Sequence, residues 1–265
     1  MKISGKVAIV TGGARGIGKR IVEVLADKGA KIVVGDILEQ GEEIVAELNK
    51  QRDNKVAVFH LCDVSKLDEL NGLVDRAMGE FGALDIVVNN AGIRGSYIWM
   101  DSGYESLSKT IDINLKAPIE GTRLAVKAFY KAQRPGCVVN ISSIFGVRFS
   151  ELLGVYGATK AGLVAFTAAS APLAQGTPPI RVNSVAPVYI DTTMSTHGVP
   201  EEINKHLRIF GENTEDGVAS EVVRCIEDES LAGDTIVMNP DGPGSVHQGS
   251  KAESFGFIKY MDACS

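Results

Sequence analysis

The sequence has few cysteines, few aromatic residues and no long apolar run. Aromatic residues make up 6% of the chain, and no stretch of about 18 consecutive apolar residues occurs, so we expect no membrane-spanning helix. The first residues carry no signal-peptide cleavage pattern. Four cysteines lie far apart, with neither a CxxC pair nor a histidine at ligand spacing, and we therefore expect free thiols in a cytoplasmic, reducing compartment and no metal site: Cys62, Cys137, Cys225 and Cys264.

Basic residues are also in deficit. The chain has 27 Lys and Arg against 33 Asp and Glu, which gives a net charge of −6. Non-specific binding of nucleic acid requires a basic surface, so nucleic acid is not an expected partner. Apolar residues (45%) and charged residues (23%) stand at ordinary globular values, which excludes a disordered chain. Glycine is the one residue in surplus, with 29 of 265 positions and no three-residue repeat, which excludes collagen.

An apolar run followed by an amphipathic segment recurs along the chain. The apolar runs predict seven strands, at Lys6–Val10, Lys31–Asp36, Val56–Cys62, Leu84–Asn89, Cys137–Ile141, Ile180–Val185 and Thr235–Met238. Apolar residues at helical spacing predict helices at Gly16–Lys28, Glu39–Lys50, Ser65–Glu80, Ser106–Tyr130, Tyr156–Ala174 and Asp216–Asp228. Pro172 lies inside the fifth of these helices, which we expect to kink or end there.

Strands that alternate with helices indicate βαβ units and a parallel sheet. We therefore predict a doubly wound (Rossmann-type) α/β fold, in which a seven-stranded parallel sheet carries helices on both faces. The sequence has no linker rich in proline, serine or charge, and we expect a single domain of residues 1–240 followed by a C-terminal tail of residues 241–265.

A glycine-rich turn, Thr11–Gly18, joins the first strand to the first helix and reads TGGARGIG. Glycines at this place let the backbone approach a pyrophosphate, while the helix N-terminus presents N–H groups and the positive end of the helix dipole. The spacing Gly12-x3-Gly16-x-Gly18 differs from the G-x-G-x-x-G of the dinucleotide fingerprint. The alternative interpretation is a structural turn that binds no ligand.

Asp36 ends the second strand, 18 residues after Gly18. A carboxylate at this place can accept hydrogen bonds from a ribose 2′-hydroxyl and repels a 2′-phosphate. Ile37 follows it, where a basic residue would favour the phosphate, and Arg15 is the one charge that argues the other way. These residues favour NAD over NADP; the alternative for Asp36 is a solvated strand end.

Tyr156 and Lys160 stand at positions i and i+4 of a predicted helix and therefore share one face. The preceding strand ends near Ser142 and Ser143, so both motifs can face the carboxyl edge of the sheet, where open α/β sheets bind ligands. A phenol has a pKa near 10. A lysine ammonium about 4 Å away would lower that pKa by roughly three, less the cost of desolvation. Tyr156 could then act as a general acid or base.

Taken together, these motifs resemble those of the short-chain dehydrogenase/reductase family. The matching residues come in the family's order over residues 5 to about 240: Thr11–Gly18, Asp63, Asn89, Asn90, Ala91, Gly92, Asn114, Ser143, Tyr156 and Lys160. Ser143 stands 13 residues before Tyr156, the usual family spacing, which selects it over Ser142. The resemblance implies an oxidoreductase that transfers a hydride between NAD and a small-molecule secondary alcohol or ketone.

The resemblance also implies roles for individual residues. The expected catalytic residues are Asn114, which would hold a water, Ser143, which would bind the substrate oxygen, Tyr156, the general acid/base, and Lys160, which would hold the nicotinamide ribose. The expected cofactor-binding residues are Gly12, Arg15, Gly16, Ile17, Gly18, Asp36, Asp63, Val64, Asn90, Ala91, Gly92, Tyr156, Lys160, Pro187, Val188 and Ile190.

Two features bear on the site and on assembly. The family usually has Pro-Gly where this chain has Pro187-Val188, and valine adds bulk beside the nicotinamide and disfavours a positive φ.

Small residues form a stripe on the Tyr156–Ala174 helix, and family members commonly dimerise through this helix and the one before it. We expect a homodimer or homotetramer, with packing of the stripe onto the sheet alone as the alternative.

The substrate is expected to bind between loops that follow the fourth, fifth and sixth strands. The candidate residues are Arg94, Tyr97, Trp99, Arg148, Phe149, Tyr189, Met194 and His197, with residues 192–210 as a lid. Residues 225–233 are similar to the NAD-dependent 15-hydroxyprostaglandin dehydrogenase branch of the family, which favours oxidation of a lipophilic alcohol. Two alternatives stay open: an NADPH-dependent ketoreductase, and a non-catalytic dinucleotide-binding sensor.

Overall fold

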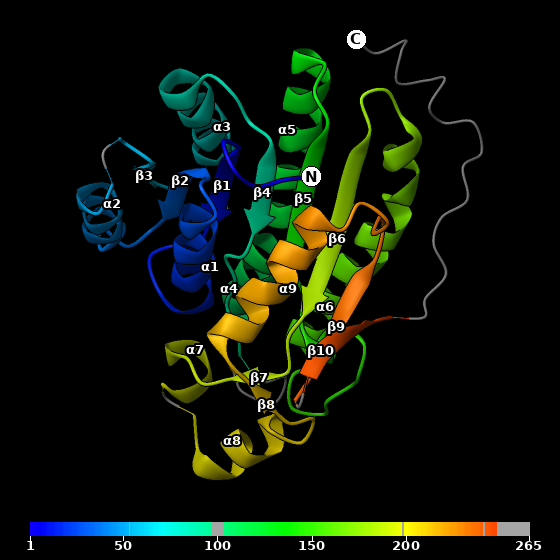
Figure 1. Ribbon diagram of the computed structural model, residues 1–265. Coiled ribbons are helices and arrows are strands. Elements are labelled where there is room, and N and C mark those ends of the chain that lie inside the picture. The colour runs from blue at the N-terminus through cyan, green and yellow to red at the C-terminus, as the bar shows by residue number, and fades with distance from the viewer. Residues whose placement is uncertain (53, 97–102, 198, 241, 248–265) are drawn as a thin grey trace.

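The computed structural model describes residues 1–52, 54–96, 103–197, 199–240 and 242–247. Its centre is an eight-stranded sheet in the order β10-β9-β6-β5-β4-β1-β2-β3 (Figure 1). The strands are β1 (Val7–Thr11), β2 (Lys31–Asp36), β3 (Ala57–Leu61), β4 (Ile86–Asn89), β5 (Gly136–Ile141), β6 (Ile180–Ala186), β9 (Thr235–Asn239) and β10 (Gly242–Val246). The seven strands from β1 to β9 pair in parallel, which confirms the doubly wound α/β fold.

The eighth strand, β10, is a small difference from the predicted sheet. It pairs antiparallel with β9 and has the sequence Gly-Pro-Gly-Ser-Val, which contains no apolar run. Its place is fixed by a helix instead. Glu221 accepts a hydrogen bond from the Gly244 amide (2.7 Å), and Arg224 donates to the Gly244 carbonyl (2.8 Å). Such long-range contacts leave no local pattern in the sequence.

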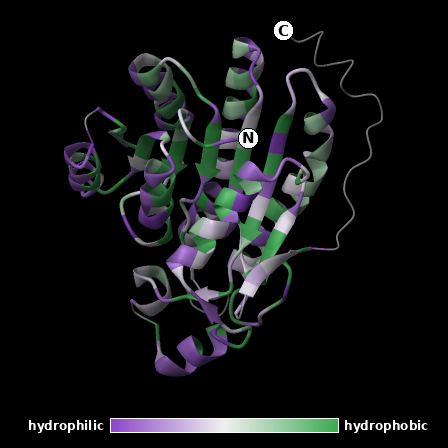
Figure 2. Ribbon diagram, in the orientation of Figure 1, coloured by the Kyte–Doolittle hydropathy of each residue, from purple (hydrophilic) through white to green (hydrophobic). Residues whose placement is uncertain are grey.

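Helices cover both faces of the sheet. Three of them, α1 (Gly16–Asp27), α2 (Gly41–Lys50) and α9 (Glu215–Glu227), share one apolar cluster with Ala8 and Val10 of β1. The opposite face, with Val7 and Ile9, packs against α3 (Leu67–Phe81) and α5 (Ala117–Ala132). Figure 2 shows hydrophobic strands at the centre and hydrophilic residues on the outer helices. A sheet buried on both faces requires the near-continuous apolar runs of its strands.

The long helix expected at Ser106–Tyr130 is divided in the structure. It consists of α4 (Gly103–Ile111), a π-helical turn (Asp112–Lys116) and α5. Pro118 stands at the start of α5, and its missing N–H and its ring are incompatible with a regular bond to the carbonyl four residues back, at Asn114. The wider turn accommodates the proline. Such single π turns often mark functional sites.

Proline also ends the next helix. The helix α6 (Gly154–Ala169) stops before Pro172 and passes into a 3-10 turn at Ala171–Gln175. The sequence predicts that the helix kinks or ends at Pro172, and in the structure it ends before this residue.

A small unit lies beyond the carboxyl edge of the sheet (Figure 1). It contains β7 (Tyr189–Ile190) paired with β8 (Glu212–Asn213), and the short helices α7 (Thr193–Thr196) and α8 (Glu201–Leu207). An apolar cluster connects it to the edge, formed by Ile144, Phe145, Leu153, Val188, Tyr189 and Leu207. The segment expected as a lid therefore carries helices of its own. Over the described part of the chain, no helix has the length and apolarity needed to cross a membrane.

Candidate active site

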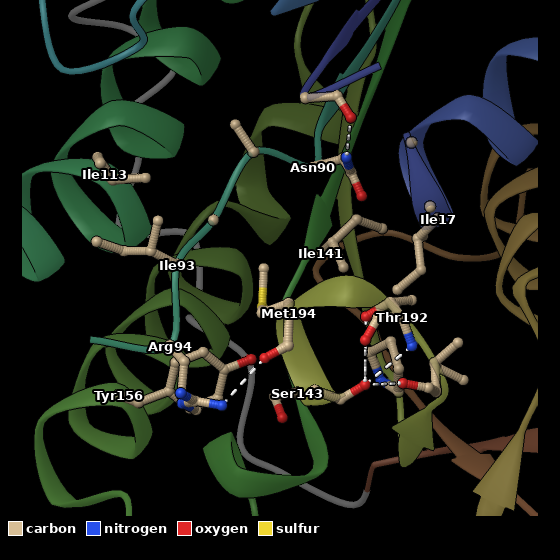
Figure 3. A pocket seen from close by; sticks show the side chains of 18 of the residues that line it. Ile17, Asn90, Ile93, Arg94, Ile113, Ile141, Ser143, Tyr156, Thr192 and Met194 are labelled. Atoms are coloured by element: carbon tan, nitrogen blue, oxygen red, sulfur yellow. Dashed lines mark hydrogen bonds between the residues drawn. The ribbon is translucent and has the colours of Figure 1, made fainter. Parts of the chain in front are cut away.

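A cavity of about 320 Å³ opens at the carboxyl edge of the parallel strands (Figure 3). All sixteen residues expected to bind the cofactor line it, together with Ser143. They come from the loops after β1, β2, β3, β4, β5 and β6 and from α6, so the sheet gathers segments that lie far apart in the sequence. Asn114 is the one expected site residue that is not part of the lining.

The glycine-rich turn brings the start of α1 against the cavity. Gly16 begins the helix with a φ of +54°, a conformation that residues with side chains rarely adopt. A Cβ atom on Gly18 would lie 1.9 Å from the Gly12 carbonyl oxygen, so only glycine fits. The Asn90 amide holds the turn from the side, with hydrogen bonds to the carbonyls of Thr11 (2.9 Å) and Gly12 (3.0 Å). The first N–H groups of α1 are thereby presented where a pyrophosphate would bind.

The Asp36 carboxylate is fixed at the end of β2. It is 7% exposed, and it accepts hydrogen bonds from the backbone N–H of Ala14 (2.9 Å) and of Leu38 (3.0 Å). These bonds set the orientation of the carboxylate beside the glycine-rich turn. Crowded glycines, helix N–H groups and a carboxylate at the strand end together fit the pyrophosphate and ribose of a dinucleotide.

Asp63 lines the same end of the cavity, after β3. Its carboxylate accepts hydrogen bonds from the hydroxyl (2.7 Å) and the backbone N–H (3.0 Å) of Ser65. These bonds, the hydroxyl one foremost, lower the pKa of Asp63 despite its partial burial. Lys109 of α4 also lines the cavity and lowers that pKa further. Asp63 is therefore held as an anion.

Ser143 and Tyr156 both line the cavity, and Ser143 affects the pKa of Tyr156. Ser143 follows β5 and is 6% exposed; its hydroxyl accepts a hydrogen bond from the Phe145 backbone N–H (3.2 Å). Burial raises the pKa of Tyr156, and the hydrogen bond with Ser143 offsets only part of this effect. The expected lowering by Lys160 therefore does not dominate in the protein alone, because desolvation of the phenolate costs more.

Lys160 lies one turn after Tyr156 on α6, as the spacing predicts. Its ammonium donates a hydrogen bond to the Ile141 carbonyl (2.7 Å) and lies 5.7 Å from the centre of the Tyr156 ring. Lys160 is 4% exposed, and burial lowers its pKa from 10.5 to about 8. The site thus holds a buried cation directly beneath a phenol.

Asn114 braces the loop after β4 from behind the cavity. Its amide accepts a hydrogen bond from the Ile93 N–H (2.8 Å) and donates one to the Ile93 carbonyl (2.7 Å). A Cβ atom on Gly92 would lie 3.4 Å from Asn114 Oδ1 and 3.6 Å from Lys160 Nζ. Asn114 therefore sits next to the lysine and positions the backbone that passes over it.

Val188 does not distort the backbone where the family usually has glycine. Among the described residues, Gln133 is the one non-glycine residue with a positive φ, so Val188 adopts an ordinary conformation. The valine is 6% exposed and packs in the apolar cluster with Ile144 and Phe145 while also lining the cavity. The Val188 side chain therefore forms part of the apolar wall of the cavity.

Thr192 lines the cavity, but the sequence analysis did not name it as a site residue. This residue precedes α7 as its N-cap in a capping box with Ser195, and its Cγ2 lies 3.6 Å from where a Cβ of Gly16 would stand. A hydroxyl residue before a short helix is the signal that could have pointed to it. Of the expected substrate residues, Arg94, Tyr189 and Met194 line the cavity, whereas Arg148, Phe149 and His197 do not. Tyr97 and Trp99 lie outside the described residues.

A doubly wound sheet with a glycine-rich turn and a serine, a tyrosine and a lysine at its carboxyl edge defines a nucleotide-binding α/β oxidoreductase. The comparison with known families agrees with this class. The model of the short chain dehydrogenases matches residues 6–202, and the chain belongs to that family.

Relatives in the family have diverse activities. The chain is 40% identical to the 3-oxoacyl-(acyl-carrier-protein) reductase FabG of Chlamydia muridarum, over 75% of this chain and 79% of the relative. It is 32% identical to the human 15-hydroxyprostaglandin dehydrogenase (NAD(+)), over 88% of this chain and 90% of the relative. It is 31% identical to the short chain dehydrogenase helC of Aspergillus fumigatus, over 91% and 98% respectively. These relatives support an oxidoreductase that uses a nicotinamide dinucleotide.

Proposed function

We propose that the protein transfers a hydride between NAD and a secondary alcohol or ketone, with Tyr156 as the general acid/base. The observation that supports this most directly is that Ser143, Tyr156 and Lys160 line the same cavity as the glycine-rich turn and Asp36. One end of the cavity thus suits a dinucleotide, and the other places a proton-transfer group beside it.

The chain supplies positioning and proton transfer. A bound NAD⁺ would supply the hydride acceptor for the alcohol carbon and a positive charge near Tyr156. Ser143 binds the substrate oxygen and holds it against the phenol. Tyr156 takes the hydroxyl proton during oxidation and returns it during reduction. The buried Lys160 would hold the nicotinamide ribose, while Asn114 keeps the neighbouring loop in place.

Asp36 is the basis for choosing NAD. Its buried carboxylate lies where a 2′-phosphate would have to be accommodated, and repulsion between the two charges disfavours NADP. The relative named as an NAD(+) dehydrogenase covers most of the chain, which supports the same choice. The exposed Arg15 argues for the NADPH-dependent ketoreductase, as does the reductase activity in the name of FabG.

The test is a panel of secondary alcohols and ketones, followed by nicotinamide absorbance with each cofactor. We expect turnover with NAD(H), loss of at least about 100-fold in kcat for Tyr156→Phe, and a shift toward NADP(H) for Asp36→Ser. Phe149→Leu, an exposed change outside the cavity lining, is the control. Turnover that is faster with NADP(H) in the wild type would overturn the cofactor choice. Activity unchanged in Tyr156→Phe would overturn the catalytic role.

We further propose a homodimer or homotetramer formed through α5 and α6, in a cytoplasmic setting. The three described cysteines, Cys62, Cys137 and Cys225, are buried and unpaired with one another, and a cytoplasmic setting would keep them as thiols. Light scattering of the purified protein tests the assembly, and a monomeric mass would reject it.

A further inference from the structure

Arg94 lies at the end of the cavity where the reaction would occur. It follows Gly92 and Ile93, the backbone that passes over Lys160 and is held by Asn114. Figure 3 shows its side chain reaching across the cavity, where Nη1 donates a hydrogen bond to the Met194 carbonyl at 3.1 Å. The guanidinium therefore lies between the loop after β4 and the segment that contains α7.

The charges that line the cavity are unevenly distributed. Both carboxylates of the described lining lie at the nucleotide end, Asp36 as the last residue of β2 and Asp63 after β3, and there they are accompanied by the cations Arg15 and Lys109. The described lining near Ser143 and Tyr156 carries Arg94 and Lys160, which are both cations. A low-dielectric cleft lined by charge of one sign concentrates ligands of the opposite sign.

Apolar side chains form much of this end. Ile144, Phe145, Leu153, Val188 and Leu207 line it and belong to one buried cluster. Arginine presents five N–H donors in a planar fork that matches a carboxylate, and it keeps its charge at every working pH. An apolar wall with one such fork suits a molecule that has an acidic head and a hydrocarbon chain.

We propose that Arg94 binds a carboxylate of the substrate, so that the enzyme acts on hydroxy acids or keto acids with an apolar chain. This inference rests on the proposed function and names the class of substrate for the same site. Ser143 and Tyr156 hold the reacting oxygen, and Arg94 fixes the orientation of the molecule by its charged end. Arg94 is thus a specificity-determining residue.

The test compares each acid with its uncharged ester. The substrates are 2-, 3- and 4-hydroxyoctanoate and their methyl esters, with NAD⁺, and the measured quantity is the ratio of kcat/KM for acid over ester. The variants are Arg94→Met, which removes the charge at similar length, and Arg94→Lys, which keeps the charge but not the fork. Arg76→Met is the matched control, since Arg76 of α3 is exposed and does not line the cavity.

We expect the wild type to prefer at least one acid over its ester. Arg94→Met should lower that ratio by about 10- to 100-fold, as loss of charge-assisted hydrogen bonds predicts. Arg94→Lys should lower this ratio less, and Arg76→Met should leave it unchanged. Titration calorimetry with octanoate and octanamide, with and without NADH, gives a readout that needs no turnover: octanoate should bind more tightly, and Arg94→Met should remove the difference.

Three outcomes would overturn the inference. One is a wild type that oxidises the esters as well as the acids and binds octanoate no better than octanamide. The second is an Arg94→Met variant that loses acid and ester activity by the same factor, which would make Arg94 a structural tie to Met194. The third is an Arg94→Met variant that binds NADH more weakly while its acid-over-ester ratio of kcat/KM is unchanged, which would assign Arg94 to cofactor binding. The absence of any turnover in the wild type, acids and esters alike, would instead count against the proposed function.

Discussion

Replacing Lys160 by methionine should stabilise the protein while abolishing its activity. Burial lowers the pKa of Lys160 from 10.5 to about 8, and one pKa unit corresponds to about 1.36 kcal/mol. Keeping the charge inside the fold therefore costs about 3 kcal/mol at pH 7. Methionine has a similar length and no charge, but the Ile141 carbonyl would lose a hydrogen-bond donor, at a cost of about 1 kcal/mol. The expected net gain is about 2 kcal/mol.

The gain should depend on pH in a defined direction. The unfolded chain keeps the lysine proton up to pH 10.5, whereas the folded protein releases it above about pH 8. Between these values the unfolded state binds more protons, so the stability of the wild type rises with pH. The cost of the charge then falls from about 3 kcal/mol at pH 7 to about 1 kcal/mol at pH 10, and the advantage of the variant nearly disappears.

Urea unfolding at pH 7, 9 and 10 measures this effect. At pH 7 we also expect a rise in Tm of about 4 to 8 °C for a chain of this size. Lys127→Met on the exposed side of α5 is the control and should change stability by no more than about 0.5 kcal/mol. A variant less stable than the wild type at pH 7, or stability differences that do not change with pH, would refute the reasoning. Both results would mean that Lys160 is not a costly buried cation.

Three further substitutions test the glycine-rich turn and the stability of the fold. Gly18→Ala should abolish NAD binding, because the new Cβ would lie 1.9 Å from the Gly12 oxygen; titration calorimetry measures it. Gly79→Ala in α3, where no atom lies within 4 Å of the added Cβ, should instead stabilise the protein by about 0.5 to 1 kcal/mol with unchanged turnover. Arg181→Met should lower the unfolding free energy by about 3 kcal/mol in urea, because the guanidinium donates to four carbonyls after α9 and at its end; a loss below 1 kcal/mol would contradict this.

The strands and the nucleotide end of the site could be predicted because their signals are local. Buried parallel strands need continuous apolar runs, such as the one ending at Asp36, and the glycines of the Thr11–Gly18 turn follow directly from close backbone contacts. Tyr156 and Lys160 face the same cavity because helical spacing places them on one face.

The remaining features depend on contacts that no local pattern records. The strand β10 is held by Glu221 and Arg224 of α9. The π turn before Pro118 contains Asn114, whose side chain is bonded to the backbone of Ile93, 21 residues earlier in the sequence. The pKa of Tyr156 rises rather than falls because its desolvation is set by the packed cavity and not by its neighbour in sequence.

The strand order has a consequence for how the chain folds during synthesis. The chain starts at β1 in the middle of the sheet, and the Asn90 amide reaches the Thr11 carbonyl across 79 residues of sequence. The contacts of the first helix with α9 join residues even farther apart in sequence, since Arg20 of α1 pairs with Asp216 of α9 across 196 residues. The side of α1 that packs against α9 in the shared apolar cluster therefore stays uncovered on the ribosome until α9 has been synthesised, and we expect the nascent protein to need chaperone protection over this interval.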